Sequence, residues 1–135
     1  NDRNGSHNLV VGTGNNYTAW GCKVVGARNS VRGWLSSVGG GLGNDAVHDA
    51  ANIGGGQYNL ASGKYTSIGG GWGNMALGRG STLPGGGGNI AEGEWSVVGG
   101  GRNNNTIGSY TTVAGGVRNT INDWYGSVLG GDGGW

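Results

Sequence analysis

Residues 53–63 read Ile-Gly-Gly-Gly-Gln-Tyr-Asn-Leu-Ala-Ser-Gly, and variants of this string recur along the whole chain. The asparagine sets the period, because an asparagine stands at every fifteenth position from residue 29 to residue 119. Upstream, asparagines at residues 15 and 1 continue the series at a spacing of 14. A fixed period of this kind indicates a repeat protein. The predicted turns form one repeat domain over residues 1–135 and cover 1–14, 15–28, 29–43, 44–58, 59–73, 74–88, 89–103, 104–118 and 119–133.

Three columns of this alignment are uniform. The asparagine column contains Asn29, Asn44, Asn59, Asn74, Asn89, Asn104 and Asn119. Nine residues after each asparagine stands an aliphatic residue: Val10, Val24, Val38, Ile53, Ile68, Leu83, Val98, Val113 and Val128. Two residues further on stands a glycine: Gly12, Gly26, Gly40, Gly55, Gly70, Gly85, Gly100, Gly115 and Gly130. We interpret the asparagine column as a hydrogen-bonded ladder and the aliphatic column as the core or the oligomer contact. The glycine column is interpreted as turn glycines.

The composition separates this chain from ordinary globular domains. Glycine supplies 36 of 135 residues and charged residues only 11%, against about 7% and about 25% in a typical domain. Six tryptophans and five tyrosines argue against disorder, and the absence of a three-residue glycine period excludes collagen. The net charge of +1, with scattered basic residues, gives no electrostatic footprint for nucleic acid or an anionic membrane.

A turn of this length is too short for a helical-hairpin repeat of about 30 or more residues. It suits one coil of a parallel β-solenoid, with two strands of about four or five residues joined by tight glycine turns. The segment 95–98 is predicted as one strand, and the Asn-x-Ala-x-Gly segment as the other. Each coil has few apolar side chains, and burying them within one chain gains less free energy than ordering the coil costs in conformational entropy. We therefore expect a homo-oligomer in which the aliphatic or the aromatic column faces partner chains.

The string Val/Ile-x-x-Gly-x-x-Asn-x-Ala-x-Gly, clearest in residues 53–63, resembles the head repeats of trimeric autotransporter adhesins, the YadA-like head. The resemblance spans residues 1–133. It implies a left-handed parallel β-roll of three chains side by side, displayed on a bacterial surface and binding matrix or host ligands. Two features depart from the adhesin pattern: glycine commonly replaces the second aliphatic residue of the strand, and the usual repeat length is 15, not 14.

Aromatic side chains are the most informative residues besides glycine. A column directly before the predicted strand contains Leu35, Tyr65, Trp95, Tyr110 and Tyr125, and we interpret it as a packing stack at a trimer seam. Four further tryptophans are candidate ligand-facing residues: Trp20, Trp34, Trp72 and Trp124. Exposed tryptophans on a rigid rod can stack on sugar rings or fit a receptor.

We expect no catalytic, cofactor or metal site. His7 and His48 lack companions at metal-ligand spacing, and the cluster Asp45, His48 and Asp49 is interpreted as a decorated surface turn. Cys22 is the single cysteine and cannot form an intramolecular disulfide. The glycine triplets lack the Lys-Ser/Thr pair of a phosphate loop.

The predicted function is a structural and adhesive module of an extracellular bacterial surface fibre or filament, not an enzyme. Its expected partners are copies of itself, as a homotrimer or an end-to-end fibre, and a host or cell-surface glycan or protein. Neither nucleic acid nor direct membrane contact is expected. The alternative is a receptor-binding tail-fibre segment of a phage or contractile injection particle. An ice-binding solenoid is disfavoured because the column considered for it is interrupted; it runs through Asn8, Cys22, Ser36, Ala51, Thr66, Ser81, Ser96, Thr111 and Gly126.

Overall fold

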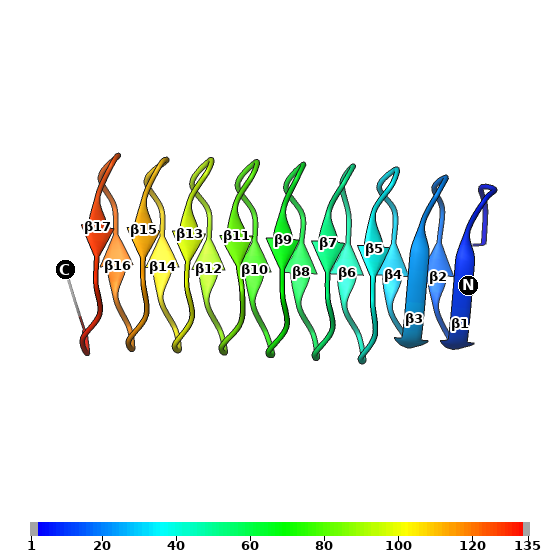
Figure 1. Ribbon diagram of the computed structural model, residues 1–135, viewed down its shortest axis with the longest axis horizontal. Helices are drawn as coiled ribbons and strands as arrows, with labels where there is room; N and C mark the ends of the chain where they lie inside the picture. Colours follow the sequence, from blue (N-terminus) through cyan, green and yellow to red (C-terminus); the bar gives the residue numbers. More distant parts are fainter. Residues whose placement is uncertain (1–2, 134–135) are drawn as a thin grey trace.

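The computed structural model describes residues 3–133, which form strands and turns without any helix. The chain winds as a rod of stacked coils, with its two ends at opposite ends of the rod (Figure 1). Odd-numbered strands form a nine-stranded parallel sheet and even-numbered strands an eight-stranded one. The predicted all-β parallel solenoid is therefore confirmed. Residues 1, 2, 134 and 135, which include the start of the first predicted turn, lie outside the described residues.

The nine-stranded sheet consists of β1 (Leu9–Thr13), β3 (Lys23–Ala27), β5 (Ser37–Val38), β7 (Asn52–Ile53), β9 (Ser67–Ile68), β11 (Thr82–Leu83), β13 (Val97–Val98), β15 (Thr112–Val113) and β17 (Ser127–Val128). The eight-stranded sheet consists of β2 (Asn16–Tyr17), β4 (Ser30–Val31), β6 (Asp45–Ala46), β8 (Leu60–Ala61), β10 (Met75–Ala76), β12 (Ile90–Ala91), β14 (Asn105–Thr106) and β16 (Thr120–Ile121). Like positions stack on like, so that Ile53 pairs with Ile68, and Ala76 with Ala91.

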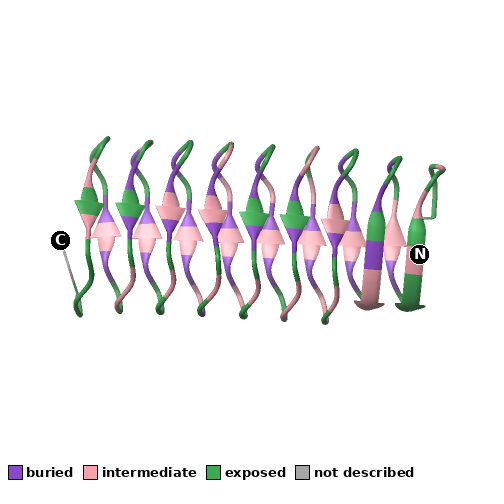
Figure 2. Ribbon diagram, viewed as in Figure 1, coloured by how far each residue is buried: buried purple, intermediate pink, exposed green. Residues whose placement is uncertain are grey.

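The core runs along the rod between the two sheets (Figure 2). The aliphatic column is 0 or 1% exposed from Val24 to Val113, and only Val10 and Val128, at the ends, are partly buried. The buried alanines of the other sheet, such as Ala61 and Ala76, belong to the same cluster. This column therefore fills the interior of a single chain and cannot face partner chains, which corrects one of the two expectations for the oligomer.

The strands are shorter than predicted in the longer coils, which begin with the coil that starts at Asn29. In the two shorter coils before it, β1 and β3 pair over their whole length from Leu9 to Thr13, whereas β5 and later strands of that sheet have two residues each. Two residues, Gly39 and Gly40, stand where the shorter coil has Val25 alone, and the additional residue interrupts the ladder. Pairing resumes at isolated bridges such as Leu42 with Gln57.

The same insertion divides the predicted glycine column into two. Gly26 stacks on Gly41, not on Gly40, because the Asn15 amide donates to the Gly26 carbonyl and the Asn29 amide to the Gly41 carbonyl. The constrained glycines are the third members of the triplets, with φ between 83° and 93°: Gly41, Gly56, Gly71, Gly86, Gly101 and Gly116. The predicted members Gly40, Gly55, Gly70, Gly85 and Gly115 have open space where a Cβ would lie and no positive φ.

The asparagines form a buried ladder along one edge of the core. In a typical step the Asn59 Oδ1 accepts from the backbone N–H of Asn74 at 3.0 Å. The Asn59 Nδ2 donates to the carbonyl of Gly55, at the end of the preceding coil, and to that of Gly71 in its own coil, both at 3.1 Å. Among the described residues, the Gly55 carbonyl and the Asn74 N–H have no backbone partner, so the Asn59 amide satisfies both. It is also a second donor to the Gly71 carbonyl, which accepts from the Gln57 N–H as well. This accounts for a buried polar residue at this position of the coil.

The hydroxyl side chains of the Ser/Thr column, the column relevant to ice binding, also point inward. Thr66, Ser96 and Thr111 are buried, and each donates to the glycine carbonyl three residues earlier, at 2.7 to 2.8 Å. These hydroxyls close the turn from inside. Because these hydroxyls are buried, this column does not form an ice-binding surface.

Candidate ligand-binding edge

Each coil turns at two narrow edges, and both edges contain residues with positive φ. At the edge between an even strand and the next odd strand, φ lies between 54° and 61° in six non-glycine residues: Leu35, Ala50, Tyr65, Trp95, Tyr110 and Tyr125. Gly21 and Gly80 occupy the same position in other coils. A residue with a side chain costs about 1–2 kcal/mol in this conformation. Glycine would therefore be the less strained choice at all six positions.

We use the name aromatic edge for the side chains displayed here: Trp34, Leu35, Tyr65, Trp95, Tyr110, Trp124 and Tyr125. All of them are between 49 and 74% exposed. The rings of Tyr110 and Tyr125 stack at 5.3 Å with an interplanar angle of 11°, and Trp124 meets Tyr125 edge-on at 6.4 Å. The aromatic edge is therefore a partly ordered apolar ridge. Whether partner chains cover it, as the trimer-seam interpretation has it, stays a prediction.

The four candidate tryptophans fall into two groups. Trp20, Trp34 and Trp124 lie on the aromatic-edge side and are more than half exposed, and His7 stacks on Trp20 at 6.0 Å. Trp72 lies at the opposite edge, where its indole covers Gly87 of the next coil. The alignment places Trp72 in a different column from the other three, and the coil puts that column at the opposite edge.

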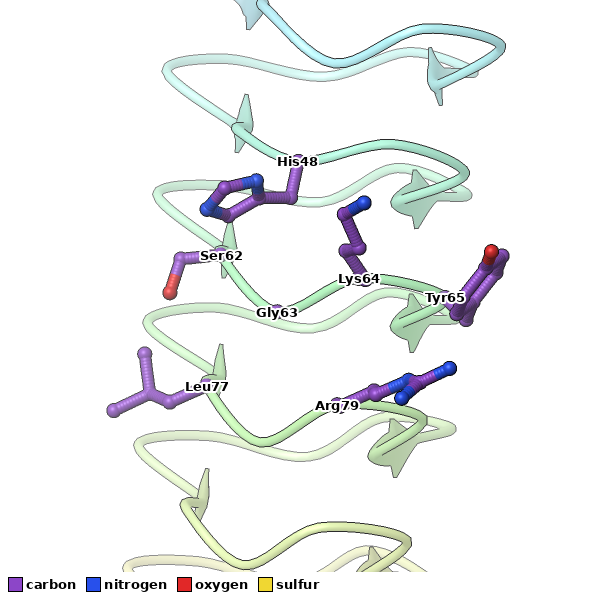
Figure 3. A pocket seen from close by; sticks show the side chains of 7 residues that line it. All are labelled: His48, Ser62, Gly63, Lys64, Tyr65, Leu77 and Arg79. Carbon is purple, nitrogen blue, oxygen red and sulfur yellow. The ribbon is translucent and has the colours of Figure 1, made fainter.

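Beside the aromatic edge is a surface hollow of about 460 Å³ formed by three successive coils (Figure 3). It is lined by His48, Ser62, Gly63, Lys64, Tyr65, Leu77 and Arg79. Gly63 lies at its middle, with Ser62 and Leu77 on one side and Lys64 and Arg79 on the other. A side chain at Gly63 would press on the backbone carbonyls of Leu77 and Gly78, at 2.7 and 2.6 Å. The close stacking of coils therefore keeps the floor of the hollow bare.

The charges around the hollow are only partly paired. The Asp49 carboxylate accepts from the backbone N–H of Trp34 at 3.0 Å and lies 3.3 Å from the Lys64 ammonium. The Trp34 hydrogen bond, and secondly Lys64, hold the pKa of Asp49 below its ordinary value. The Arg79 guanidinium lies 5.6 Å from the centre of the Tyr65 ring. It pairs with no carboxylate of residues 3–133.

Asp45, His48 and Asp49, which the sequence suggests form a decorated surface turn, do not converge on a common point. Asp45 pairs with Arg32 of the preceding coil, whereas Asp49 turns to Trp34 and Lys64. Within the described part of the chain no group of three His, Cys, Asp or Glu side chains could hold a metal ion. Sequence reasoning missed Lys64 and Arg79 as a pair, although their separation by one full repeat places them in one column.

Comparison with known proteins adds no family. No protein-family model matches the chain, and no curated protein matches it. Among the described residues no helix is long and apolar enough to cross a membrane.

Proposed function

We propose that this chain is a structural and adhesive module of an extracellular bacterial surface fibre, a rigid rod that displays a binding surface. The aromatic edge is the observation that carries the proposal. Five of its residues lie at corner positions where glycine would be less strained, yet these residues are 49 to 74% exposed. Retaining large apolar side chains in strained, exposed positions favours a role in contact with a ligand.

The rest of the rod suits display. Between Asn15 and Asn119 the described coils repeat the same core and the same asparagine step, so each coil is held by its neighbours and the edge side chains follow a regular track. Aromatic rings presented in this way offer flat apolar faces to sugar rings or to apolar side chains of a protein. Such contact requires no catalysis. The tail-fibre alternative rests on the same surface and shares the test below.

We also propose that the rod assembles as a homotrimer. We place its seam at the outer face of the eight-stranded sheet and not at the aromatic edge, because the adhesive role requires that edge to be exposed. Leu60, Met75 and Ile90 stack there on three successive coils, and all three are only partly covered within the chain. The solution mass tests this assembly, since one chain has 13.5 kDa. Met75→Lys should yield monomers, whereas Thr82→Lys, on the outer face of the other sheet, should not. A monomeric wild-type chain would remove the trimer from the proposal.

The adhesive role is tested with the full chain on beads, measuring attachment to a panel of immobilised glycans and to cultured cells. The key variant is Trp95→Gly together with Tyr110→Gly, because glycine occurs naturally in this column at Gly80. This change removes the rings and relieves the corner, so attachment should fall while thermal stability holds or rises. The matched control is Trp72→Gly at the opposite edge. Equal attachment of both variants, or none by the wild-type chain, would refute the adhesive role.

A further inference from the structure

We propose that the hollow formed by coils 44–58, 59–73 and 74–88 binds an acidic sugar, through the carboxylate or sulfate that the sugar carries. The inference rests on the proposed adhesive function and names the class of ligand at one place on the rod. It is carried by four side chains that three different coils bring together: His48, Lys64, Tyr65 and Arg79.

Arg79 is the anchor. Its guanidinium is held over the Tyr65 ring, an arrangement that favours a fixed orientation of the planar group. Its hydrogen-bond donors have no carboxylate partner among residues 3–133. A guanidinium with free donors in a fixed plane matches the two oxygens of a carboxylate or sulfate, which it binds as a bidentate pair.

Lys64 supplies a second cation in the same column, one coil away from Arg79. Asp49 pairs with it at 3.3 Å, which fixes the ammonium but uses one of its three donors. Across the bare floor at Gly63, the Ser62 hydroxyl and the His48 imidazole (Figure 3) offer further polar partners for sugar hydroxyls.

The surroundings favour a sugar over a polyanion. Leu77 and the Tyr65 ring border the hollow and can contact the apolar face of a pyranose. In the next coil, the positions equivalent to Leu77 and Arg79 are Glu92 and Glu94. The positive charge is thus confined to two coils, whereas a nucleic acid requires a longer basic track. The fitting ligand carries isolated negative charges on an otherwise neutral glycan.

The experiment is titration calorimetry on the full chain with five probes: a glucuronic-acid oligosaccharide, a monosulfated galactose, the neutral counterpart of each and sodium sulfate. We expect binding of at least one acidic sugar, with the two acidic probes showing which oxyanion is preferred. Arg79→Gln should weaken it by at least about tenfold, the loss of one charge-assisted bidentate contact. Arg102→Gln makes the same charge change at the opposite edge and should leave affinity unchanged.

Equal affinity for the neutral sugars, equal affinity for sodium sulfate, equal effects of the two arginine variants, or no binding would each overturn the site. Its failure is separable from failure of the adhesive function. If attachment depends on Trp95 and Tyr110 but not on Arg79, the adhesive role stands and this site falls. If Arg79 governs sugar binding but the rod attaches to nothing, the site stands and the adhesive role falls.

Discussion

Replacing one of two adjacent glycines by alanine separates the structural roles of the triplet. Gly71 has φ of 86°, and a Cβ there would overlap the carbonyl oxygen of Gly86 in the next coil. Gly70 has no positive φ, and a Cβ there would meet nothing within 4 Å. Gly71→Ala is therefore expected to be severe and Gly70→Ala mild, although the two residues are neighbours of the same type.

The magnitude follows from what the added methyl group disturbs. A side chain in the left-handed region costs about 1–2 kcal/mol. The Gly86 carbonyl that it displaces accepts from the Trp72 backbone N–H at 3.1 Å and from the Asn74 side-chain amide at 3.0 Å. Each lost hydrogen bond costs about 1 kcal/mol, so Gly71→Ala should lower the free energy of unfolding by about 3–4 kcal/mol. Gly70→Ala should change it by less than about 1 kcal/mol, in the stabilising direction, because alanine restricts the unfolded chain.

Urea unfolding followed by far-ultraviolet circular dichroism measures both variants against the wild-type chain. The prediction concerns the difference between the two variants, so each serves as the control for the other. Equal midpoints, or a larger loss for Gly70→Ala, would show that the register of the glycine triplet has been misassigned.

Three other changes test the interior. The buried hydroxyl of Thr106 has no partner among the described residues, and Val31 fills the same column; Thr106→Val should therefore raise the free energy of unfolding by about 1 kcal/mol, and a loss in urea melts would contradict this. Burial raises the pKa of the Cys22 thiol, so at pH 8 a disulfide reagent should react with it far more slowly in the native chain than in urea; similar rates would place the thiol at the surface. Asn74→Ala removes bonds to two glycine carbonyls and leaves the Asn89 N–H unpaired, and should cost about 3 kcal/mol; a melting curve like that of the wild-type chain would mean that the ladder is dispensable.

The periodicity was sufficient for the fold but not for the register within it. An aliphatic residue that recurs once in every turn of 14 or 15 residues indicates short coils that stack in parallel, and the unbroken column from Val10 to Val128 made this predictable. The alignment of the glycine triplets with the shorter coils was not predictable, because the three residues of a triplet are identical. Counting forward from Val24 places Gly26 against Gly40, while counting backward from Asn29 places it against Gly41. Only the hydrogen bonds of the asparagine amides decide between the two.

The inward or outward direction of the polar columns was equally hidden. Ser36 and Ser37 are adjacent and identical, yet only Ser36 is fully buried. The corner residue before them, Leu35, has positive φ and determines which of the two serines faces the core. A bulky residue such as leucine gives no sign of such a corner in a sequence. The hollow beside Tyr65 was not predicted for a related reason. Its charged residues, Asp49, Lys64 and Arg79, come from three coils, and a column that mixes residue types gives no periodic signal.

The hydrogen bonds that join one coil to the next run along the rod, and its two ends lie at opposite tips (Figure 1). A pulling force applied through the ends therefore acts first on a terminal coil, which is held by one neighbour instead of two. Releasing one coil frees about 50 Å of extended chain. Under tension the rod should lengthen by repeated steps of nearly constant size, so that a load is absorbed one coil at a time while the remainder keeps its shape.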